Sequence, residues 1–432
     1  MRRKPFSWPF YYGWVIVAIA FLSLGVWLAM RATFSVFLVV LLDEFHWSRA
    51  SAAGVQSLSF VVYTCSAPVV GTLIDRFGPR RIILPGIILL CGGLLLSATV
   101  QTLFQFYLFY GIIAACGVTF VSISAYSAIL AHWFETRRGL ASGIAVSGMG
   151  IGAFALVPLI QYVIGAEGWR FAFLVLAGLV FLLLFPVTAV FLRHKPGELG
   201  LRPDGENWGT APKRGPVEVI DPRWAETDWT LKRALREGRF WSLLAVGFLS
   251  IIPFYLILIH GAKLLVDRGF SGMGAAFIIA FVGINSSVFK VFWGWLSDRI
   301  GREITFTAGV GATVLGIFFL LLFEAGGSRQ TAYLFALFLG CGWGVMAPIY
   351  MSASADLFQG KSYGLIYGIL EAVIGLGSAL GPWLGGFIFD ATGSYRTAFL
   401  IAIAACIMSC PFLWIAAPRK VRQVRSAPAG AP

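Results

Sequence analysis

The stretch that decides the fold is GTLIDRFG at residues 71–78, which recurs as GWLSDRIG at residues 294–301. Both copies have glycine at their first and last positions and an Asp-Arg pair between them, and the second begins 223 positions after the first. Each copy lies where a long apolar segment ends in a basic turn. The repeat predicts a membrane protein of two parallel halves, which work by moving against each other around a central site.

Two further stretches repeat at nearly the same offset. The glycine-rich run at 139–152 recurs 225 residues later at 364–377, and Arg170, Ala172 and Phe173 recur 226 residues later. Three matches in the same register indicate that the chain arose by duplication.

The composition is that of a protein embedded in lipid. Hydrophobic residues make up 58% of the chain and charged residues 12%, whereas soluble domains carry about 25% charged residues. The net charge of +13 could suggest nucleic acid as a partner. The basic residues, however, lie in short loops between apolar segments, as at the cytoplasmic flanks of membrane helices. The predicted partner is therefore the lipid bilayer, and nucleic acid is not expected.

The apolar runs predict an all-α integral membrane protein with 12 transmembrane helices in two pseudo-symmetric six-helix bundles. The domains are expected at 1–192 and 240–417, joined by a cytoplasmic linker at 193–239 and followed by a cytoplasmic tail at 418–432. The linker is expected to hold one amphipathic helix at about Trp229–Arg239. The expected helices are 12–41, 51–74, 82–100, 104–133, 139–165, 170–192, 240–266, 273–297, 304–323, 331–355, 363–388 and 396–417.

The distribution of lysine and arginine predicts the orientation. With both termini cytoplasmic, the inside loops and tails hold 15 of the 33 basic residues and the outside loops hold 6. The first apolar run is too long for the apolar region of a signal peptide, so we expect this span to be retained. We expect a multi-pass protein of the bacterial inner membrane that acts as a monomer.

Three ionisable residues lie well inside the predicted helices: Arg31, Lys290 and Glu371. A charged side chain at the bilayer centre costs about 2.5–3.5 kcal/mol on insertion scales, so these groups should line a wet cavity or pair with one another. Lys290 and Glu371 fall at similar depth in the second half, and Arg31 lies in the first half. This arrangement predicts cations that face a central site from both halves.

The pattern favours a site for a small organic anion. Arg31 and Lys290 would attract a carboxylate, and Glu371 would neutralise Lys290 in the empty site and couple a proton together with it. Polar groups from Asn285, Tyr126 and Tyr350 are expected to contribute to substrate binding. The alternative is a buried ion pair that only fixes helix packing.

The repeated turns are predicted to act as a conformational latch. An aspartate at a helix end can pair with basic residues or lie near the N-terminus of a neighbouring helix. The alternative is a tight turn whose arginines only set topology. The expected latch residues are Gly71, Asp75, Arg76, Gly294, Asp298 and Arg299.

Across essentially its whole length the chain resembles the major facilitator superfamily, because GTLIDRFGPRR and GWLSDRIGRE look like the motif that this family carries between helices 2–3 and 8–9. The resemblance implies 12 helices, alternating access, and a role for Asp75 and Asp298 in holding one state closed. The motif does not distinguish substrates.

A narrower resemblance is to the monocarboxylate transporter and oxalate/formate antiporter group. It rests on YYGWVIV, HWFETRRGLASGIAVSG, HGAKLLVDRGFS, HKPGELGLRPDG and DATGSYRTAFL, and on Arg31, where the group often has a cation. In that group a helix-8 cation, usually arginine, binds the substrate carboxylate, and the matching residue here is Lys290. The eukaryotic members tend to have an aspartate one turn earlier, where this chain has Ser286. Lysine is a point charge whose pKa shifts readily, which favours proton coupling.

These observations predict a secondary transporter that carries a small organic anion, a monocarboxylate, together with a proton. One alternative is an oxalate/formate-type exchanger of dicarboxylates, and another is a membrane sensor that binds without translocating. An enzyme is not expected, because the chain has no nucleophile–base pair, metal cluster or nucleotide loop. No cofactor and no metal are therefore expected.

Overall fold

The computed structural model describes residues 10–205 and 217–424, which group into two compact units. Unit 1 comprises Met1–Glu135, Ala145–Lys213 and Ser362–Ala372. Unit 2 comprises Thr136–Ile144, Arg214–Lys361 and Val373–Pro432. The basic residues of the N-terminal tail, linker residues 206–216 and tail residues 425–432 lie outside the described part. Each unit is a bundle of helices.

Within the described residues, twelve helical stretches are long and apolar enough to cross a membrane. This number confirms the predicted all-α membrane fold, and the stretches follow the expected order with ends that differ by a few residues. They are Gly13–Phe45, Gly54–Phe77, Pro79–Ser97, Leu103–Trp133, Arg138–Glu167, Trp169–Phe191, Gly238–Asp267, Met273–Ile300, Arg302–Glu324, Arg329–Phe358, Tyr363–Thr392 and Arg396–Lys420.

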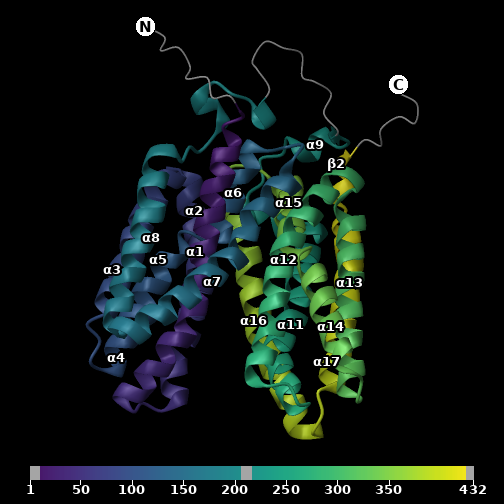
Figure 1. Ribbon diagram of the computed structural model, residues 1–432. Coiled ribbons are helices and arrows are strands. Elements are labelled where there is room, and N and C mark those ends of the chain that lie inside the picture. The colour runs from purple at the N-terminus through teal and green to yellow at the C-terminus, as the bar shows by residue number, and fades with distance from the viewer. Residues whose placement is uncertain (1–9, 206–216, 425–432) are drawn as a thin grey trace. The chain divides into compact units, whose positions relative to one another are not determined.

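Unit 1 is built from the helices of the first half and the first turns of a later helix. Figure 1 shows α3 and α8 side by side, and these helices are in contact along their length. Its elements are α1 (Gly13–Phe45), α2 (Arg49–Phe77), α3 (Pro79–Ser97), α4 (Leu103–Phe106), the π-helix η1 (Tyr107–Ala114), α5 (Ala115–Thr119), α6 (Ile123–Trp133), most of α7 (Arg138–Glu167), α8 (Trp169–Phe191), η2 (Pro196–Leu199), η3 (Pro203–Gly205) and the start of α16 (Tyr363–Thr392).

Unit 2 holds the remaining helices together with the first turns of α7. Figure 1 shows α13 in the same part of the bundle as α14 and α17, and it is in contact with both of them. Its other elements are β1 (Val217–Val219), α9 (Pro222–Ala225), α10 (Leu231–Ala234), α11 (Gly238–Asp267), α12 (Gly272–Ile300), α13 (Arg302–Glu324), α14 (Arg329–Trp343), α15 (Met346–Phe358), most of α16, α17 (Arg396–Ala416), η4 (Pro418–Lys420) and β2 (Arg422–Val424).

Two spans that the sequence predicted as continuous helices are interrupted. The span predicted at 104–133 breaks between α5 and α6, at residues 120–122, and the span predicted at 331–355 breaks between α14 and α15, at residues 344–345. The breaks occupy corresponding places in the two sequence repeats. Interrupted helices leave backbone groups unpaired inside the membrane, and in transporters they often line the binding site.

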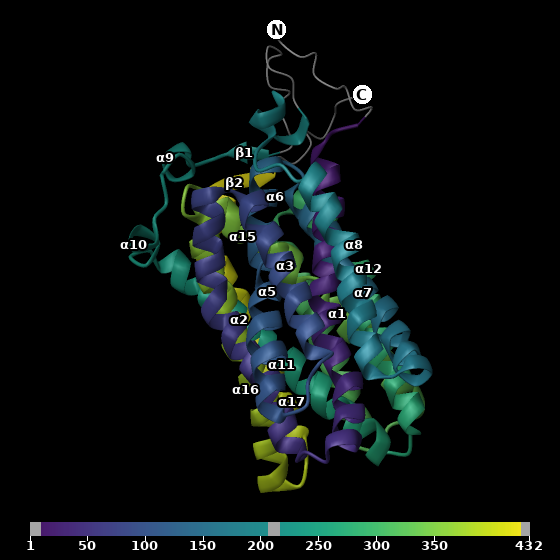
Figure 2. The same cartoon turned by 90° about the vertical axis from the view of Figure 1, so that its left-hand side faces the viewer.

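The linker differs from its prediction. The expected helix at Trp229–Arg239 is wrong: the chain forms only the short α10, and α11 then begins at Gly238. Trp229 is instead buried against Trp224, with ring centroids 4.5 Å apart. A short antiparallel pair of β1 and β2, visible in Figure 2, joins the linker to the tail, with Glu218 opposite Gln423. Indole burial and strand pairing therefore outweigh helix propensity here.

Glycines let several helices approach closely. In unit 1, a Cβ on Gly25 of α1 would lie 3.0 Å from the carbonyl oxygen of Gly148 on α7. In unit 2, a Cβ on Gly381 of α16 would lie 2.6 Å from the carbonyl oxygen of Ile252 on α11. Glycine at these positions therefore lets the two backbones approach closely, because a side chain would collide with the neighbouring carbonyl group.

Candidate functional site

Arg31 lies inside unit 1 within a cage of aromatic rings. Its guanidinium carbon is 4.2 Å from the ring centroid of Trp27, 4.2 Å from that of Tyr63 and 5.0 Å from that of Phe60. Trp27 and Arg31 share a face of α1 because they are four residues apart, and the other two rings come from α2. Cation–π contacts stabilise a guanidinium and leave its N–H groups available. Among the described residues Arg31 makes no ion pair.

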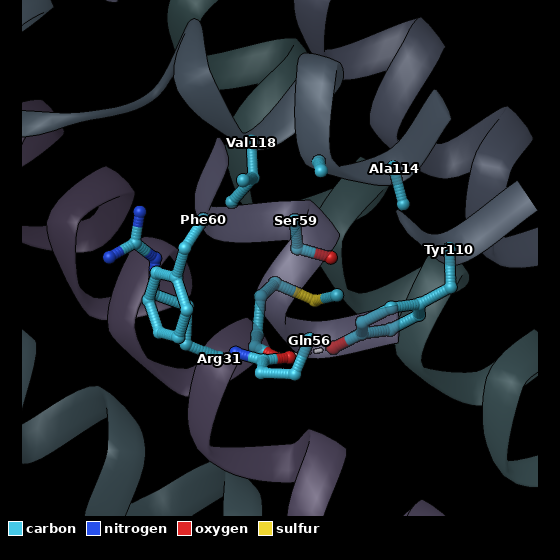
Figure 3. A pocket seen from close by; sticks show the side chains of 9 residues that line it. Arg31, Gln56, Ser59, Phe60, Tyr110, Ala114 and Val118 are labelled. Atoms are coloured by element: carbon cyan, nitrogen blue, oxygen red, sulfur yellow. Dashed lines mark hydrogen bonds between the residues drawn. The ribbon is translucent and has the colours of Figure 1, made fainter. Parts of the chain in front are cut away.

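A cavity of about 340 Å³, counted with its open mouth, lies beside Arg31 between α1, α2, η1 and α5. Figure 3 shows Gln56, Ser59 and Tyr110 around it, with Phe60 beside the Arg31 side chain. The Tyr110 hydroxyl donates to the carbonyl oxygen of Met30 at 2.7 Å. The amide oxygen of Gln56 is buried and accepts no hydrogen bond. The cavity is therefore largely apolar, with one unsatisfied acceptor.

Glu371 belongs to unit 1, because it lies in the first turns of α16. The Tyr63 hydroxyl donates to Oε1 of Glu371 at 3.0 Å. Glu371 is 4% exposed and Tyr63 is 3% exposed, so this hydrogen bond is shielded from solvent. Tyr63 thus contacts the Arg31 guanidinium with its ring and the Glu371 carboxylate with its hydroxyl.

Tyr126 is fully buried on α6, and its hydroxyl is 2.6 Å from the hydroxyl of Ser23 on α1. Its partner Ser23 lies on α1, the helix that also carries Arg31. The predicted role of Tyr126 in substrate binding stays a prediction.

Lys290 is buried inside unit 2 on α12, where it is 2% exposed. Its Nζ lies 5.1 Å from the ring centroid of Trp343, the last residue of α14. Phe254 of α11 stacks on the same indole, so Lys290 takes the opposite face of the ring. Among the described residues this lysine makes neither a hydrogen bond nor an ion pair. A buried ammonium without a carboxylate partner is costly, and an anionic ligand would compensate it.

Two other predicted binding residues of unit 2 donate to backbone carbonyls. The amide nitrogen of Asn285 donates to the carbonyl oxygen of Leu337 at 2.7 Å and so joins α12 to α14. The Tyr350 hydroxyl donates to the carbonyl oxygen of Leu243 at 3.0 Å. Both contacts hold helices together, and substrate binding by these two residues stays a prediction.

The two motif aspartates make the same contact, one in each unit. Asp75, near the end of α2, accepts from the amides of Gly364 and Leu365 at 3.0 Å each. Asp298, near the end of α12, accepts from the amides of Gly139 and Leu140 at 2.9 and 2.8 Å. Each carboxylate thus binds the N-terminal turn of another helix, α16 or α7, where the helix dipole favours negative charge.

The glycines and arginines of the motif have separate places. Gly71 packs against the backbone of Gly364, and Gly294 packs against the backbone of Gly139, with no room for a Cβ. The arginines contact aromatic rings: Arg76 lies over the ring of Phe77 at 5.2 Å and Arg299 lies over that of Trp295 at 4.0 Å. The motif arginines are exposed, so they do not neutralise the neighbouring aspartates.

Unit 2 also contains a buried ion network that the sequence analysis missed. Arg302 contacts Asp298 at 2.6 Å and Asp356 at 3.1 Å, and Arg138 contacts Asp356 at 2.5 Å and also donates to Gln359. The predicted helix ended at 355, so the acid at 356 was assigned to a loop. In the structure α15 continues to Phe358 and buries it.

Arg31, Glu371 and Tyr126 belong to unit 1, where Arg31 and Glu371 both contact Tyr63. Lys290, Asn285 and Tyr350 belong to unit 2, where each contacts a different residue. Glu371 hydrogen-bonds to Tyr63, which the sequence analysis did not single out. A pairing of Lys290 with Glu371 stays a prediction. The aromatic cage was missed because aromatic residues are common in apolar segments, and no spacing rule marked these three.

Comparison with known proteins gives a consistent result. The profile described as Major Facilitator Superfamily matches residues 14–358 and 277–431. Monocarboxylate transporter 11 of Mus musculus is 29% identical over 94% of this chain and 88% of its own length. Monocarboxylate transporter 2 of Homo sapiens is 24% identical over 94% of this chain and 85% of its own length. These relatives are transporters and not enzymes.

Two solved structures share the fold. The proton:xylose symporter XylE, bound to 6-bromo-6-deoxy-D-glucose, superposes with a TM-score of 0.74 at 15% identity and covers 94% of this chain and 95% of its own. The human organic anion transporter MFSD10 gives 0.68 at 16% identity and covers 94% of this chain and 100% of its own. At these identities the likeness establishes architecture alone.

Proposed function

Because the chain belongs to the Major Facilitator Superfamily, we propose that it is a secondary transporter that carries a small monocarboxylate with a proton by alternating access. The observation that carries this proposal is that Arg31 and Lys290 are both held inside the helical bundles and that neither makes an ion pair within the described residues. Buried cations in membrane proteins line substrate paths far more readily than they face lipid.

The nature of the anion follows from the neighbours of the two cations. Arg31 and Lys290 are each held by aromatic rings, so their N–H groups remain available for oxygen ligands. The cavity beside Arg31 is lined mainly by apolar side chains, and Arg31 is its one charged lining residue, which favours a ligand with a single charge. The monocarboxylate transporters among its relatives support the same class.

Proton coupling is assigned to Glu371, with Lys290 as a second group that can release a proton. Glu371 is buried and accepts a hydrogen bond from Tyr63, whose ring contacts Arg31. An anion bound at Arg31 would therefore interact electrostatically with the Glu371 carboxylate. Carrying one anion with one proton is electroneutral. The step therefore avoids the roughly 2.3 kcal/mol that a 100 mV potential imposes on each charge.

The repeated turns supply the latch. Asp75 accepts from an amide at the start of α16, and Asp298 accepts from one at the start of α7. When the transporter opens on the side of the membrane where these turns lie, the hydrogen bonds would break and release the two helix ends. We propose that this side faces the cytoplasm and that both termini lie there, because lysine and arginine are enriched in the loops on this side. We also propose that the protein resides in the bacterial inner membrane. We propose that the monomer is the working unit.

The test is uptake of radiolabelled propionate into proteoliposomes under an imposed pH gradient. The wild type is expected to accumulate propionate only when the gradient can drive protons in with it. Glu371→Gln is expected to keep propionate counterflow and lose the response to the gradient, because exchange needs no net proton movement. Glu324→Gln, which changes an acid at the end of α13, is the matched control and should behave as the wild type.

If the wild type exchanges oxalate in counterflow at a rate independent of pH, the result would favour the oxalate/formate-type exchanger. In that exchanger Arg31 and Lys290 would each bind one carboxylate of the substrate. Equilibrium binding of propionate with neither uptake nor counterflow would favour a sensor. Either result would contradict the proposed symport.

A further inference from the structure

The break between α5 and α6 leaves backbone donors unpaired in the interior of unit 1. Ser122 is the N-cap of α6 in an extended conformation, and its side chain makes no capping hydrogen bond. The amides of Ser124 and Ala125 lie in the first turn, and neither has a partner among the described residues. Both residues are 0% exposed. Buried N–H groups without partners are rare in native proteins, so this turn requires an explanation.

A third unpaired donor lies at the same level. Nε1 of Trp27 is buried, with the residue 4% exposed, and it has no hydrogen-bond partner. Ser23 on α1 contacts Tyr126 on α6. Trp27 lies one turn after Ser23 on α1, and Ser122 lies one turn before Tyr126 at the start of α6. The two helices are antiparallel, because they are the first and fourth spans in sequence. One turn along each helix from the Ser23–Tyr126 contact leads to Trp27 and to Ser122. Both residues border Tyr63, because the Trp27 ring lies 5.8 Å from the Tyr63 ring and the Ser122 side chain interacts with the Tyr63 hydroxyl.

The surroundings of this turn are rich in donors and poor in acceptors. The ring of Trp27 lies 5.8 Å from that of Tyr63, and the Arg31 guanidinium contacts both rings. The carboxylate of Glu371 is the acceptor nearby, and it already receives the Tyr63 hydroxyl. Within the described residues, the three N–H groups thus have no hydrogen-bond partner, and the Arg31 guanidinium makes no ion pair. The positive end of α6, a helix of 11 residues, adds a favourable potential for an anion.

We propose that the N-terminal turn of α6 is the subsite that binds the substrate carboxylate in unit 1. The amides of Ser124 and Ala125 and the indole N–H of Trp27 would donate to its two oxygens, and Arg31 would supply the opposite charge. This inference rests on the proposed function, which it deepens by assigning carboxylate recognition to the backbone of a broken helix. Helix termini of this kind bind carboxylate groups in other transporter architectures.

A side chain introduced at position 122 can occupy the subsite in place of the ligand. Ser122→Asn places an amide oxygen where a helix cap accepts from the second and third N–H groups of its helix. The substituted cap would compete with the ligand for the amides of Ser124 and Ala125. Ser122→Ala is the matched control, because it removes the serine hydroxyl, which contacts the Ser124 hydroxyl at 2.8 Å, and leaves both amides unpaired. Trp27→Phe removes the third donor and keeps a ring beside Arg31.

The experiment measures binding of acetate, propionate and butyrate to the purified full-length protein by calorimetry, with propionamide as the uncharged probe. We expect propionate, and not propionamide, to bind the wild type. Ser122→Asn and Trp27→Phe should each weaken propionate binding by roughly tenfold or more, the effect of losing one charge-assisted hydrogen bond. Ser122→Ala should weaken it by less than threefold. The ligand-free Ser122→Asn protein should unfold at a higher temperature than the wild type, because its helix is capped.

The inference is overturned if Ser122→Asn binds propionate as the wild type does, or if the asparagine and alanine variants lose affinity equally. If the asparagine variant does not fold, Trp27→Phe decides alone, and unchanged binding by it overturns the inference. Absence of binding of all three carboxylates to the wild type is a different result, because it refutes the proposed function itself.

Discussion

Replacing Asp298 with asparagine is expected to destabilise the protein about twice as much as the same change at Asp75. The sequence motif treats the two aspartates as equivalents, but their surroundings differ. Asp75 receives two amides and makes no ion pair with a described residue. Asp298 receives two amides and also contacts Arg302 at 2.6 Å, inside a network in which Arg302 and Asp356 are buried.

The magnitudes follow from these contacts. Asparagine keeps one carbonyl oxygen, so Asp75→Asn loses one charge-assisted hydrogen bond and should cost about 1.5–3 kcal/mol. Asp298→Asn also leaves the buried guanidinium of Arg302 with a single anionic partner. Removing one partner of a buried ion pair costs about 3–5 kcal/mol, and we expect the total in this range.

The assay is thermal unfolding of both variants in one detergent, together with Arg302→Gln and the double variant Asp298→Asn/Arg302→Gln. The coupling between Asp298 and Arg302 should fall within about 0.5–3 kcal/mol. Equal destabilisation by the two asparagine variants, or no coupling in the double variant, would refute the reasoning that the two latches are chemically unequal.

Two further perturbations test the helix packing and the linker. Gly364→Ala should abolish folding or latch closure, because its Cβ would lie 2.6 Å from the carbonyl oxygen of Gly71 and 2.8 Å from the Asp75 carboxylate. Gly178 has open space around it, so the Gly178→Ala protein is the control and should unfold at the wild-type temperature. Burial and the adjacent Lys195 lower the pKa of His194 from 6.5 to about 4, so the unfolded chain takes up a proton before the folded one does. Stability should therefore fall as the pH is lowered from about 6.5 to about 4, and His194→Gln should flatten this part of a melting-temperature profile against pH, whereas an unchanged slope would contradict the assignment.

The architecture was predictable because its signals are long and repeated. Apolar runs of membrane-spanning length and a motif that recurs at 223 residues predict twelve spans in two halves, whatever the details of side-chain packing. Arg31, Lys290 and Glu371 were also predictable as interior residues, since a charge inside an apolar segment is costly wherever it lies. These inferences depend on composition and spacing alone.

The remaining features depend on tertiary contacts. The choice of Tyr63 as the partner of Glu371 joins residues 308 positions apart, and no local pattern marks it. The break before α6 falls within VSISAYS, where serines and small residues are compatible with a continuous helix as well as with a cap. The amphipathic pattern of its neighbours predicts Trp229 in a helix. In the structure Trp229 lies before α10, and its indole packs against that of Trp224.

The most direct test of the central claim is the initial rate of pH-driven propionate uptake by Arg31→Gln and Lys290→Gln in proteoliposomes. Lys361→Gln, which changes an exposed lysine paired with Asp228, serves as the control. We predict that each interior substitution reduces the rate at least tenfold, while the control retains the wild-type rate. Wild-type uptake by both interior variants would contradict the claim that the two interior cations bind the transported anion.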